Sequence, residues 1–224
     1  NTLPAFEAAM AADYGIECDI RPIKGGLPIV FHDESLERLI DGRGPVAALG
    51  ETDLEKLRYR TGGATILTLS GLLEFVAGRV PLLIEIKSEW EPPDKNFITN
   101  IASLVTPYRG PLALMSFDPA LMAAVKEAAP AVPRGIVSGS YSGPGWWPGK
   151  IGTVRAAALR DLLESGPAAP DFYAYEIEAL PTPVTEHARR VIGLPLFTWT
   201  VRTTEQRRKS EAWADAMIFE GFAP

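Results

Sequence analysis

The sequence predicts an α/β fold, and specifically a (β/α)8 TIM barrel of parallel strands. Short apolar runs alternate with helix-length stretches in an even rhythm along all 224 residues, a pattern typical of parallel sheets with helical crossovers. The run that begins at residue 80 is continuously apolar at its start, as expected of a strand buried on both faces. The length suits one barrel, and no linker divides the chain. We therefore expect a single domain over residues 1–224.

The expected elements follow from the spacing of apolar residues. Helices are expected at 3–14, with Asn1 or Thr2 as its cap, and at 52–60, 68–76, 119–128, 154–164, 184–191 and 204–213. Strands are expected at 15–20, 80–88, 112–117, 135–137, 172–177, 196–201 and 216–219, with residues 27–32 as a short strand or extended arm. Setting this arm aside, seven core strands follow an opening helix, whereas a closed barrel needs eight. We expect the first strand to precede Asn1, which would make the domain N-terminally incomplete. An open seven-stranded sheet is the alternative, but the even rhythm favours the barrel.

Composition narrows the class of protein. Hydrophobic residues make up 46% and charged residues 22% of the chain, which is ordinary for a globular protein. The net charge of −6 argues against a general nucleic-acid binder, and no apolar stretch approaches the roughly 18 residues that span a bilayer. No signal peptide pattern is visible, so a cytoplasmic location is expected. The single cysteine, Cys18, excludes an internal disulfide and is interpreted as a small buried residue.

Two carboxylates stand two residues apart on the strand expected at 15–20. Residues at this spacing share one face of a strand, so Glu17 and Asp19 point the same way, while Cys18 points the other way. Two like charges side by side repel and are unstable in a dry core without compensation. A hard divalent cation is the simplest compensation, because Mg²⁺ and Ca²⁺ prefer carboxylate oxygens. The alternative is a strand edge with solvated acids.

A second strand brings charges to the same end of the sheet. Glu85 and Lys87 alternate with apolar residues near the C-terminal end of the run at 80–88. In parallel α/β proteins the chemistry gathers at the C-terminal ends of the strands. We therefore expect one shared site, with Glu85 as a third carboxylate and Lys87 as a cation suited to a phosphate. Charge balance for the acids is the alternative role for Lys87.

Histidine and aromatic residues complete the candidate set. His32 follows a short strand and suits general acid/base catalysis; alternatively, it caps a turn with Asp33. Trp199, at the end of a strand, is a candidate wall of the substrate pocket, or else packs in the core. Trp146 and Trp147 lie in a Gly/Pro-rich loop after the strand at 135–137 and suggest a lid or substrate wall; the alternative is a loop folded over an outer helix. His187 lies in a polar helix and is expected at the surface.

These motifs resemble, in order and spacing, those of the glycerophosphodiester phosphodiesterase family. The matching segments are Glu17-Cys18-Asp19, His32-Asp33, Glu85-Ile86-Lys87, Trp199-Thr200, Ser116-Phe117 after the fourth strand, and Asn1-Thr2 as the end of a Pro-Glu-Asn-Thr stretch. The resemblance covers essentially the whole chain. The family's His-Arg-Gly and its helix-start glutamate lie outside this sequence, and Phe219-Glu220-Gly221 stands where the family often has Thr-Asp.

The resemblance implies a function and a partner. It implies a phosphodiesterase that hydrolyses glycerophosphodiesters to an alcohol and glycerol 3-phosphate, acting on a small-molecule substrate without nucleic acid or stable membrane insertion. It implies Mg²⁺ or Ca²⁺ held by Glu17, Asp19 and Glu85, catalytic roles for His32 and Lys87, and substrate contacts from Phe117, Trp146, Trp147 and Trp199. A lysophospholipase D-like hydrolase and a non-catalytic phosphodiester-binding barrel are the alternatives.

Overall fold

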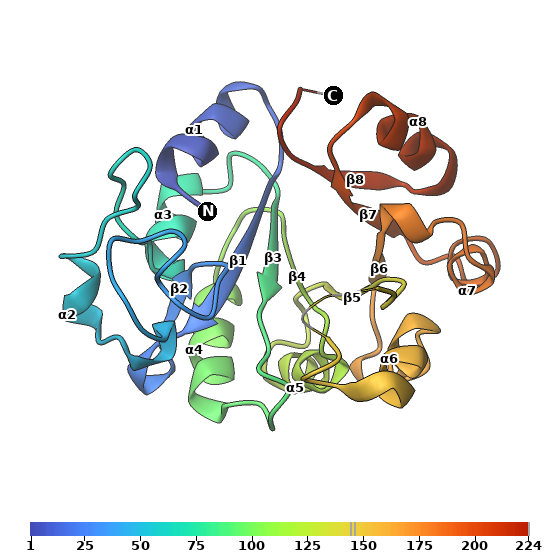
Figure 1. Ribbon diagram of the computed structural model, residues 1–224, viewed down its shortest axis with the longest axis horizontal. Helices are drawn as coiled ribbons and strands as arrows, with labels where there is room; N and C mark the ends of the chain where they lie inside the picture. The colour runs from blue at the N-terminus through green and yellow to red at the C-terminus, as the bar shows by residue number, and fades with distance from the viewer. Residues whose placement is uncertain (144, 146, 224) are drawn as a thin grey trace. The chain divides into compact units, whose positions relative to one another are not determined.

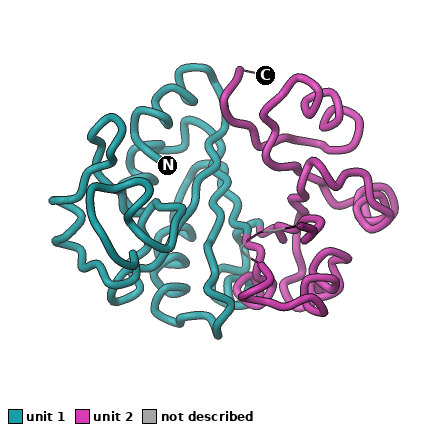
Figure 2. Tube along the Cα trace, viewed as in Figure 1, with its two compact units in different colours: residues 1–115, 124–133 teal, residues 116–123, 134–224 magenta. Residues whose placement is uncertain are grey.

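The computed structural model describes residues 1–143, 145 and 147–223. Its contacts divide the chain into two compact units (Figure 2). Unit 1 contains residues 1–115 and 124–133, and unit 2 contains residues 116–123 and 134–224. Each unit is described by itself below.

Unit 1 is built around strands that were expected from the sequence (Figure 1). The strands are β1 (Ile16–Pro22), β2 (Pro28–Val30), β3 (Leu82–Ile86) and β4 (Leu112–Ser116), in the spatial order β2-β1-β3-β4. Strands β1, β3 and β4 run parallel, and the expected arm at 27–32 contains β2, which pairs antiparallel with β1. The register places Asp19 opposite Glu85. The helices are α1 (Leu3–Ala11), α2 (Glu51–Leu54), α3 (Leu69–Val76) and α4 (Lys95–Val105), with 3₁₀ turns at Lys24–Gly26 and Val46–Ala48.

One expected helix of unit 1 is shorter than predicted, and another helix was not predicted. The helix expected at 52–60 ends at Leu54, because Tyr59 instead forms an isolated bridge with Ile40 and packs its ring 6.0 Å from that of Phe31. Both rings belong to a buried cluster that anchors the long segment between β2 and α3. Helix α4 was not expected at all. Its signals were an N-cap, Asp94, and apolar residues at helical spacing, which the structure buries: Phe97, Ile98, Ile101 and Val105.

Unit 2 has the regular alternation that the sequence predicted. Its strands are β5 (Arg134–Ser138), β6 (Phe172–Glu176), β7 (Leu196–Val201) and β8 (Ala216–Phe219), which run parallel in chain order. The helices are α6 (Gly152–Arg160), α7 (Pro183–His187) and α8 (Thr204–Trp213), and the residues of α5 (Pro119–Ala128) are divided between the two units at residues 123 and 124. Short turns lie at Gly166–Ala168 and Ile177–Ala179, and a π-helical segment, Ala188–Ile192, continues α7. His187 is exposed, as expected.

The two faces of the unit 2 strands differ in their neighbours. Tyr175 on β6 donates a hydrogen bond to the carbonyl oxygen of Arg160, and Ser138 on β5 donates one to that of Leu159. These side chains therefore point toward α6. Because side chains alternate along a strand, Glu176 on β6 points to the opposite face, which we call the inner face of unit 2.

Candidate active site

Three carboxylates meet where β1 and β3 lie side by side. Glu17, Asp19 and Glu85 each offer one oxygen, and these oxygens all lie within 4.8 Å of one another. Asp19 and Glu85 are buried, and Glu17 is half-buried. The expected same-face arrangement is thus confirmed, and Cys18 is fully buried, as expected. The alternative of a solvated strand edge does not describe this cluster.

Lys87 lies among these acids. Its Nζ is 2.7 Å from Asp19 Oδ1 and 2.6 Å from Glu85 Oε1. The side chain is 14% exposed, so the contacts are formed away from bulk solvent. One ammonium faces three carboxyl groups, so charge balance by Lys87 alone is incomplete. Lys87 therefore balances part of the negative charge, and the cluster could still accept a further positive charge.

The pKa shifts in the cluster also indicate that its negative charge is not fully balanced. Burial, followed by the proximity of Asp19 and Glu85, raises the pKa of Glu17 well above its usual value. Burial also raises the pKa of Glu85, although the Lys87 ammonium opposes the shift. Burial lowers the pKa of Lys87, but the two neighbouring carboxylates outweigh it and leave the pKa above its usual value. A divalent cation among three carboxylate oxygens would relieve this repulsion, so the donor set fits Mg²⁺ or Ca²⁺.

Asn1 fixes one of these carboxylates in place. Its Nδ2 donates to Asp19 Oδ2 at 2.8 Å, and its Oδ1 accepts a hydrogen bond from the Asp19 main-chain N–H at 2.9 Å. The hydroxyl of Tyr59 donates to the Asn1 carbonyl oxygen at 3.2 Å. Asn1 was expected only as a helix cap and as part of the Asn1-Thr2 match to the family, and nothing in its spacing signals this contact with β1.

His32 is held by both its ring and its main chain. Its Nδ1 is 2.7 Å from Asp33 Oδ1, and Arg38 donates two hydrogen bonds to the same carboxylate, each 2.6 Å long. Arg21 donates from Nε to the His32 carbonyl oxygen at 2.7 Å. The His32 side chain is 52% exposed, so it is open to a ligand. The contact with Asp33 fits both the catalytic interpretation and the turn-cap alternative.

The predicted substrate-binding aromatic residues that the structure describes belong to unit 2. Phe117 and Trp199 are half-buried, with ring centroids 5.3 Å apart in an edge-to-face arrangement. Trp147 packs edge-on against Tyr141, with centroids 6.3 Å apart. Trp146 lies outside the described residues.

Comparison with known proteins identifies the family. The model of the glycerophosphoryl diester phosphodiesterase family matches residues 1–222. The chain belongs to this family. A glycerophosphodiester phosphodiesterase from Caldanaerobacter subterraneus subsp. tengcongensis is 28% identical over 231 residues, which cover 97% of this chain and 87% of that protein.

Solved structures share the fold of this chain. A glycerophosphodiester phosphodiesterase from Thermotoga maritima has a TM-score of 0.71 and 25% identity, with coverage of 98% of this chain and 87% of that one. A phosphodiesterase from Oleispira antarctica, solved in complex with the product sn-glycerol-3-phosphate, has a TM-score of 0.75 and 18% identity, with coverage of 98% and 86%.

Family membership settles the fold and the class of reaction. The fold is the TIM-barrel-like fold of this family, which confirms the predicted fold class. The protein is an enzyme, a glycerophosphodiester phosphodiesterase, so the alternative of a non-catalytic binding barrel is not supported. Among the residues that the structure describes, no helix is long and apolar enough to cross a membrane.

Proposed function

We propose that this enzyme hydrolyses glycerophosphodiesters to an alcohol and glycerol 3-phosphate, that the reaction depends on a divalent cation, and that residues 1–224 form a single barrel domain. The cluster of Glu17, Asp19 and Glu85, with oxygens within 4.8 Å of one another, is the observation that carries this proposal. The Oleispira antarctica phosphodiesterase, which binds sn-glycerol-3-phosphate as product, supports the identity of the product. A cytoplasmic location stays a prediction from the sequence, which cell fractionation would test.

The three carboxylates would hold the cation, Mg²⁺ or Ca²⁺. A cation bound there would polarise a phosphoryl oxygen and lower the pKa of the attacking hydroxyl. Lys87, anchored at 2.6–2.7 Å by Glu85 and Asp19, places a buried positive charge beside the same oxygens. It would stabilise the negative charge that develops on the phosphate.

His32 would transfer a proton during hydrolysis. The contact between its Nδ1 and Asp33 Oδ1 leaves Nε2 on the opposite side of the ring. A protonated Nε2 can donate to the oxygen of the departing alcohol. Asp33, itself held by Arg38, would orient the ring.

Aromatic side chains would contact the organic part of the substrate. Phe117 and Trp199 offer a half-buried edge-to-face pair at the C-terminal ends of strands, where this type of barrel binds ligands. Trp147 is proposed as a second contact, and Trp146 stays a prediction from the sequence. A lysophospholipase D-like activity differs only in the size of the alcohol that these residues would accommodate.

The test is an assay of the purified full-length protein with a panel of glycerophosphodiesters, in which released glycerol 3-phosphate is measured. We expect hydrolysis that EDTA abolishes and that Mg²⁺ or Ca²⁺ restores. Asp19→Asn should lose activity, whereas Asp41→Asn, which changes a 90% exposed carboxylate, should not. Hydrolysis that persists without a divalent cation would overturn the metal proposal, and no hydrolysis of any diester would overturn the proposed reaction.

A further inference from the structure

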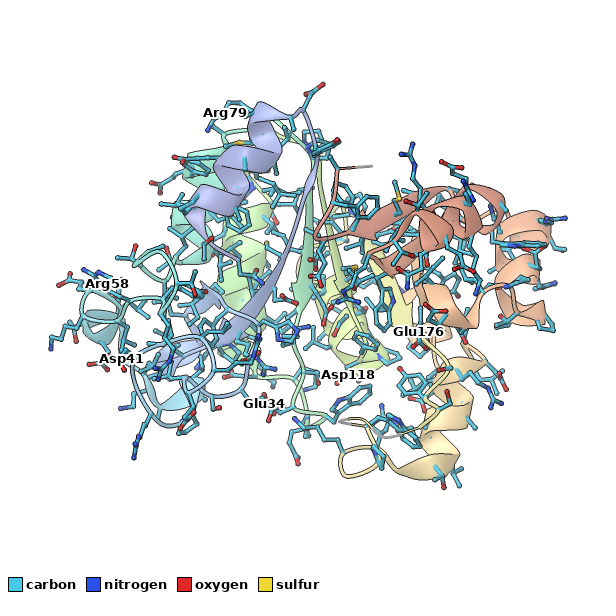
Figure 3. All side chains as sticks on the ribbon, turned by 45° about the horizontal axis from the view of Figure 1, so that its top comes forward. Glu34, Asp41, Arg58, Arg79, Asp118 and Glu176 are labelled. Carbon is cyan, nitrogen blue, oxygen red and sulfur yellow. The ribbon has the colours of Figure 1, made fainter. Side chains whose placement is uncertain are left out.

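Glu176 and Trp199 lie side by side at the ends of neighbouring strands. The register of β6 and β7 pairs the two residues, and cross-strand partners in a sheet project to the same face, about 5 Å apart. Trp199 Nε1 donates a hydrogen bond to the carbonyl oxygen of Ala174 at 3.3 Å, so the indole lies against β6. Glu176 is labelled in Figure 3. An acidic and an aromatic side chain thus share the inner face of unit 2.

The backbone just after β5 leaves space for the Glu176 carboxylate. Gly139 follows the last residue of β5, and a Cβ at this position would lie 2.9 Å from Glu176 Oε2 and 3.0 Å from Glu176 Cβ. Any larger residue would push the carboxylate away. The next residue, Ser140, donates to Oε2 from both its main-chain N–H, at 2.8 Å, and its Oγ, at 2.7 Å. Oε2 is therefore fixed in position.

The other carboxylate oxygen has no such partners. Among the residues that the structure describes, none donates a hydrogen bond to Glu176 Oε1, and no lysine, arginine or histidine forms an ion pair with this side chain. The side chain is half-buried rather than fully solvated. A fixed, half-buried carboxylate with one open oxygen attracts a positively charged ligand.

The aromatic rings of Trp199 and Phe117 also suit a positively charged ligand. The indole of Trp199 is the aromatic group that binds cations best, and Phe117 meets it edge-to-face at 5.3 Å with an interplanar angle of 76°. An ammonium or trimethylammonium group can contact a ring face and a carboxylate at the same time. We propose that Glu176, Trp199 and Phe117 form a subsite for a positively charged alcohol group of the substrate.

This inference rests on the proposed function and specifies its substrate class. The diesters in question would carry choline or ethanolamine, whose positive charge matches the carboxylate. Glycerol and inositol, as neutral alcohols, would gain nothing from Glu176. In the competing interpretation Glu176 has only a structural role: its hydrogen bonds with Ser140 would hold residues 139–140 against β6. In that case its charge would be irrelevant to the choice of substrate.

The experiment compares kcat/KM of the full-length protein for four diesters: glycerophosphocholine, glycerophosphoethanolamine, glycerophosphoglycerol and glycerophosphoinositol. We expect the wild type to prefer the two cationic diesters by about tenfold or more, a difference of about 1.4 kcal/mol. Glu176→Gln keeps an oxygen for the Ser140 hydrogen bonds but removes the charge, so the ratio of cationic to neutral kcat/KM should fall about tenfold. Glu127→Gln, which neutralises an exposed glutamate on α5, should leave this ratio unchanged. The relative rates with choline and ethanolamine separate a trimethylammonium site from a primary ammonium site.

The outcomes separate this inference from the proposed function. A wild type without preference, or an equal loss on all four diesters in Glu176→Gln, would overturn the cation subsite and leave the structural interpretation. If no diester is hydrolysed, the proposed function fails, and calorimetry with choline and tetramethylammonium still tests the subsite. Binding that Glu176→Gln weakens would support it, whereas no binding to the wild type, or equal binding to both proteins, would overturn it.

Discussion

Arg21 donates a hydrogen bond from its Nε to the main-chain carbonyl oxygen of His32, over 2.7 Å. Arg21 is buried on β1, two residues beyond Asp19, and its guanidinium also pairs with Glu89 at 2.5 Å. The strand face that carries Glu17 and Asp19 therefore also fixes the backbone of the histidine. This relationship couples the position of the acid cluster to that of the candidate proton donor.

Arg21 is accordingly expected to position His32. Arg21→Met should lower kcat by about tenfold and change KM less, because the His32 carbonyl oxygen loses its partner and the histidine backbone is free to shift. Arg21→Lys should recover part of the loss, since it restores a donor but not the planar fork. Steady-state kinetics measure both effects, with Arg43→Lys, at an exposed arginine, as the control. An Arg21→Met enzyme with wild-type kcat would show that the contact does not matter for catalysis.

Neutralising either Asp19 or Glu17 should impair both cation binding and hydrolysis. Asp19→Asn or Glu17→Gln should weaken Mg²⁺ or Ca²⁺ binding by at least about tenfold and lower hydrolysis in parallel, since each removes a negative charge from a shared site. Titration calorimetry measures the affinity, with Asp41→Asn as the matched control. If both variants bind these cations as the wild type does, the cluster is not the metal site.

His32→Ala should separate catalysis from metal binding. We expect kcat to fall by roughly 10²–10⁴-fold, the usual contribution of a positioned acid or base, with cation affinity close to that of the wild type. A diester with a good leaving group, such as a nitrophenyl phosphodiester, needs less protonation and should be rescued in part. Equal losses on good and poor leaving groups would remove His32 from the acid role, and an unchanged kcat would leave it as a turn cap.

The Asp33–Arg38 pair should make stability depend on pH. Hydrogen bonds from Arg38 hold the pKa of Asp33 below its usual value. A carboxyl whose pKa is lower in the folded state contributes stability above its unfolded pKa of about 3.9, and loses it as the pH falls through the folded value. The contribution is at most about 1 kcal/mol, because Arg38 is 64% exposed. The thermal stabilities of wild type and Asp33→Asn should differ most near pH 7, and the difference should shrink progressively as the pH falls below about 4. A constant difference would assign the effect to packing instead.

The parts of the site that sequence reasoning predicted follow from strand geometry. Alternation along a strand is fixed by the backbone, so the shared faces of Glu17 with Asp19 and of Glu85 with Lys87 could be predicted. The register that sets Asp19 opposite Glu85 depends on how two strands pair, and it became visible only in the structure. The alternation of strands and helices predicted the barrel, and the resemblance to the family supplied the expected reaction.

Other features depend on contacts between distant residues. Tyr59 lies in a predicted helix, but its burial beside Phe31 overrides local helix propensity. Glu176 ends an unremarkable apolar strand, and only its register with Trp199 and its bonds to Ser140 make it a candidate. Sequence spacing carries no information about such pairs.

The inner face of unit 2 should be sensitive to a single added methyl group. Gly135 on β5 lies opposite Phe172 on β6, and a Cβ at Gly135 would come within 2.2 Å of the Phe172 ring. That ring is buried and stacks on Phe197, with centroids 4.9 Å apart and an interplanar angle of 28°. Because the ring has a neighbour on its other side, Gly135→Ala should overpack the core and lower the free energy of unfolding by about 1–3 kcal/mol.

Chemical denaturation measures this loss, and two further variants show its cause. Gly166→Ala should change stability by less than about 1 kcal/mol, because no atom lies within 4 Å of an added Cβ there. Combining Gly135→Ala with Phe172→Leu should cost less than the sum of the two single changes, since the smaller side chain frees the space that the new methyl group needs. If Gly135→Ala alone were as stable as the wild type, the Phe172 and Phe197 rings could move apart without cost, and the inner face would be less tightly packed than this contact implies.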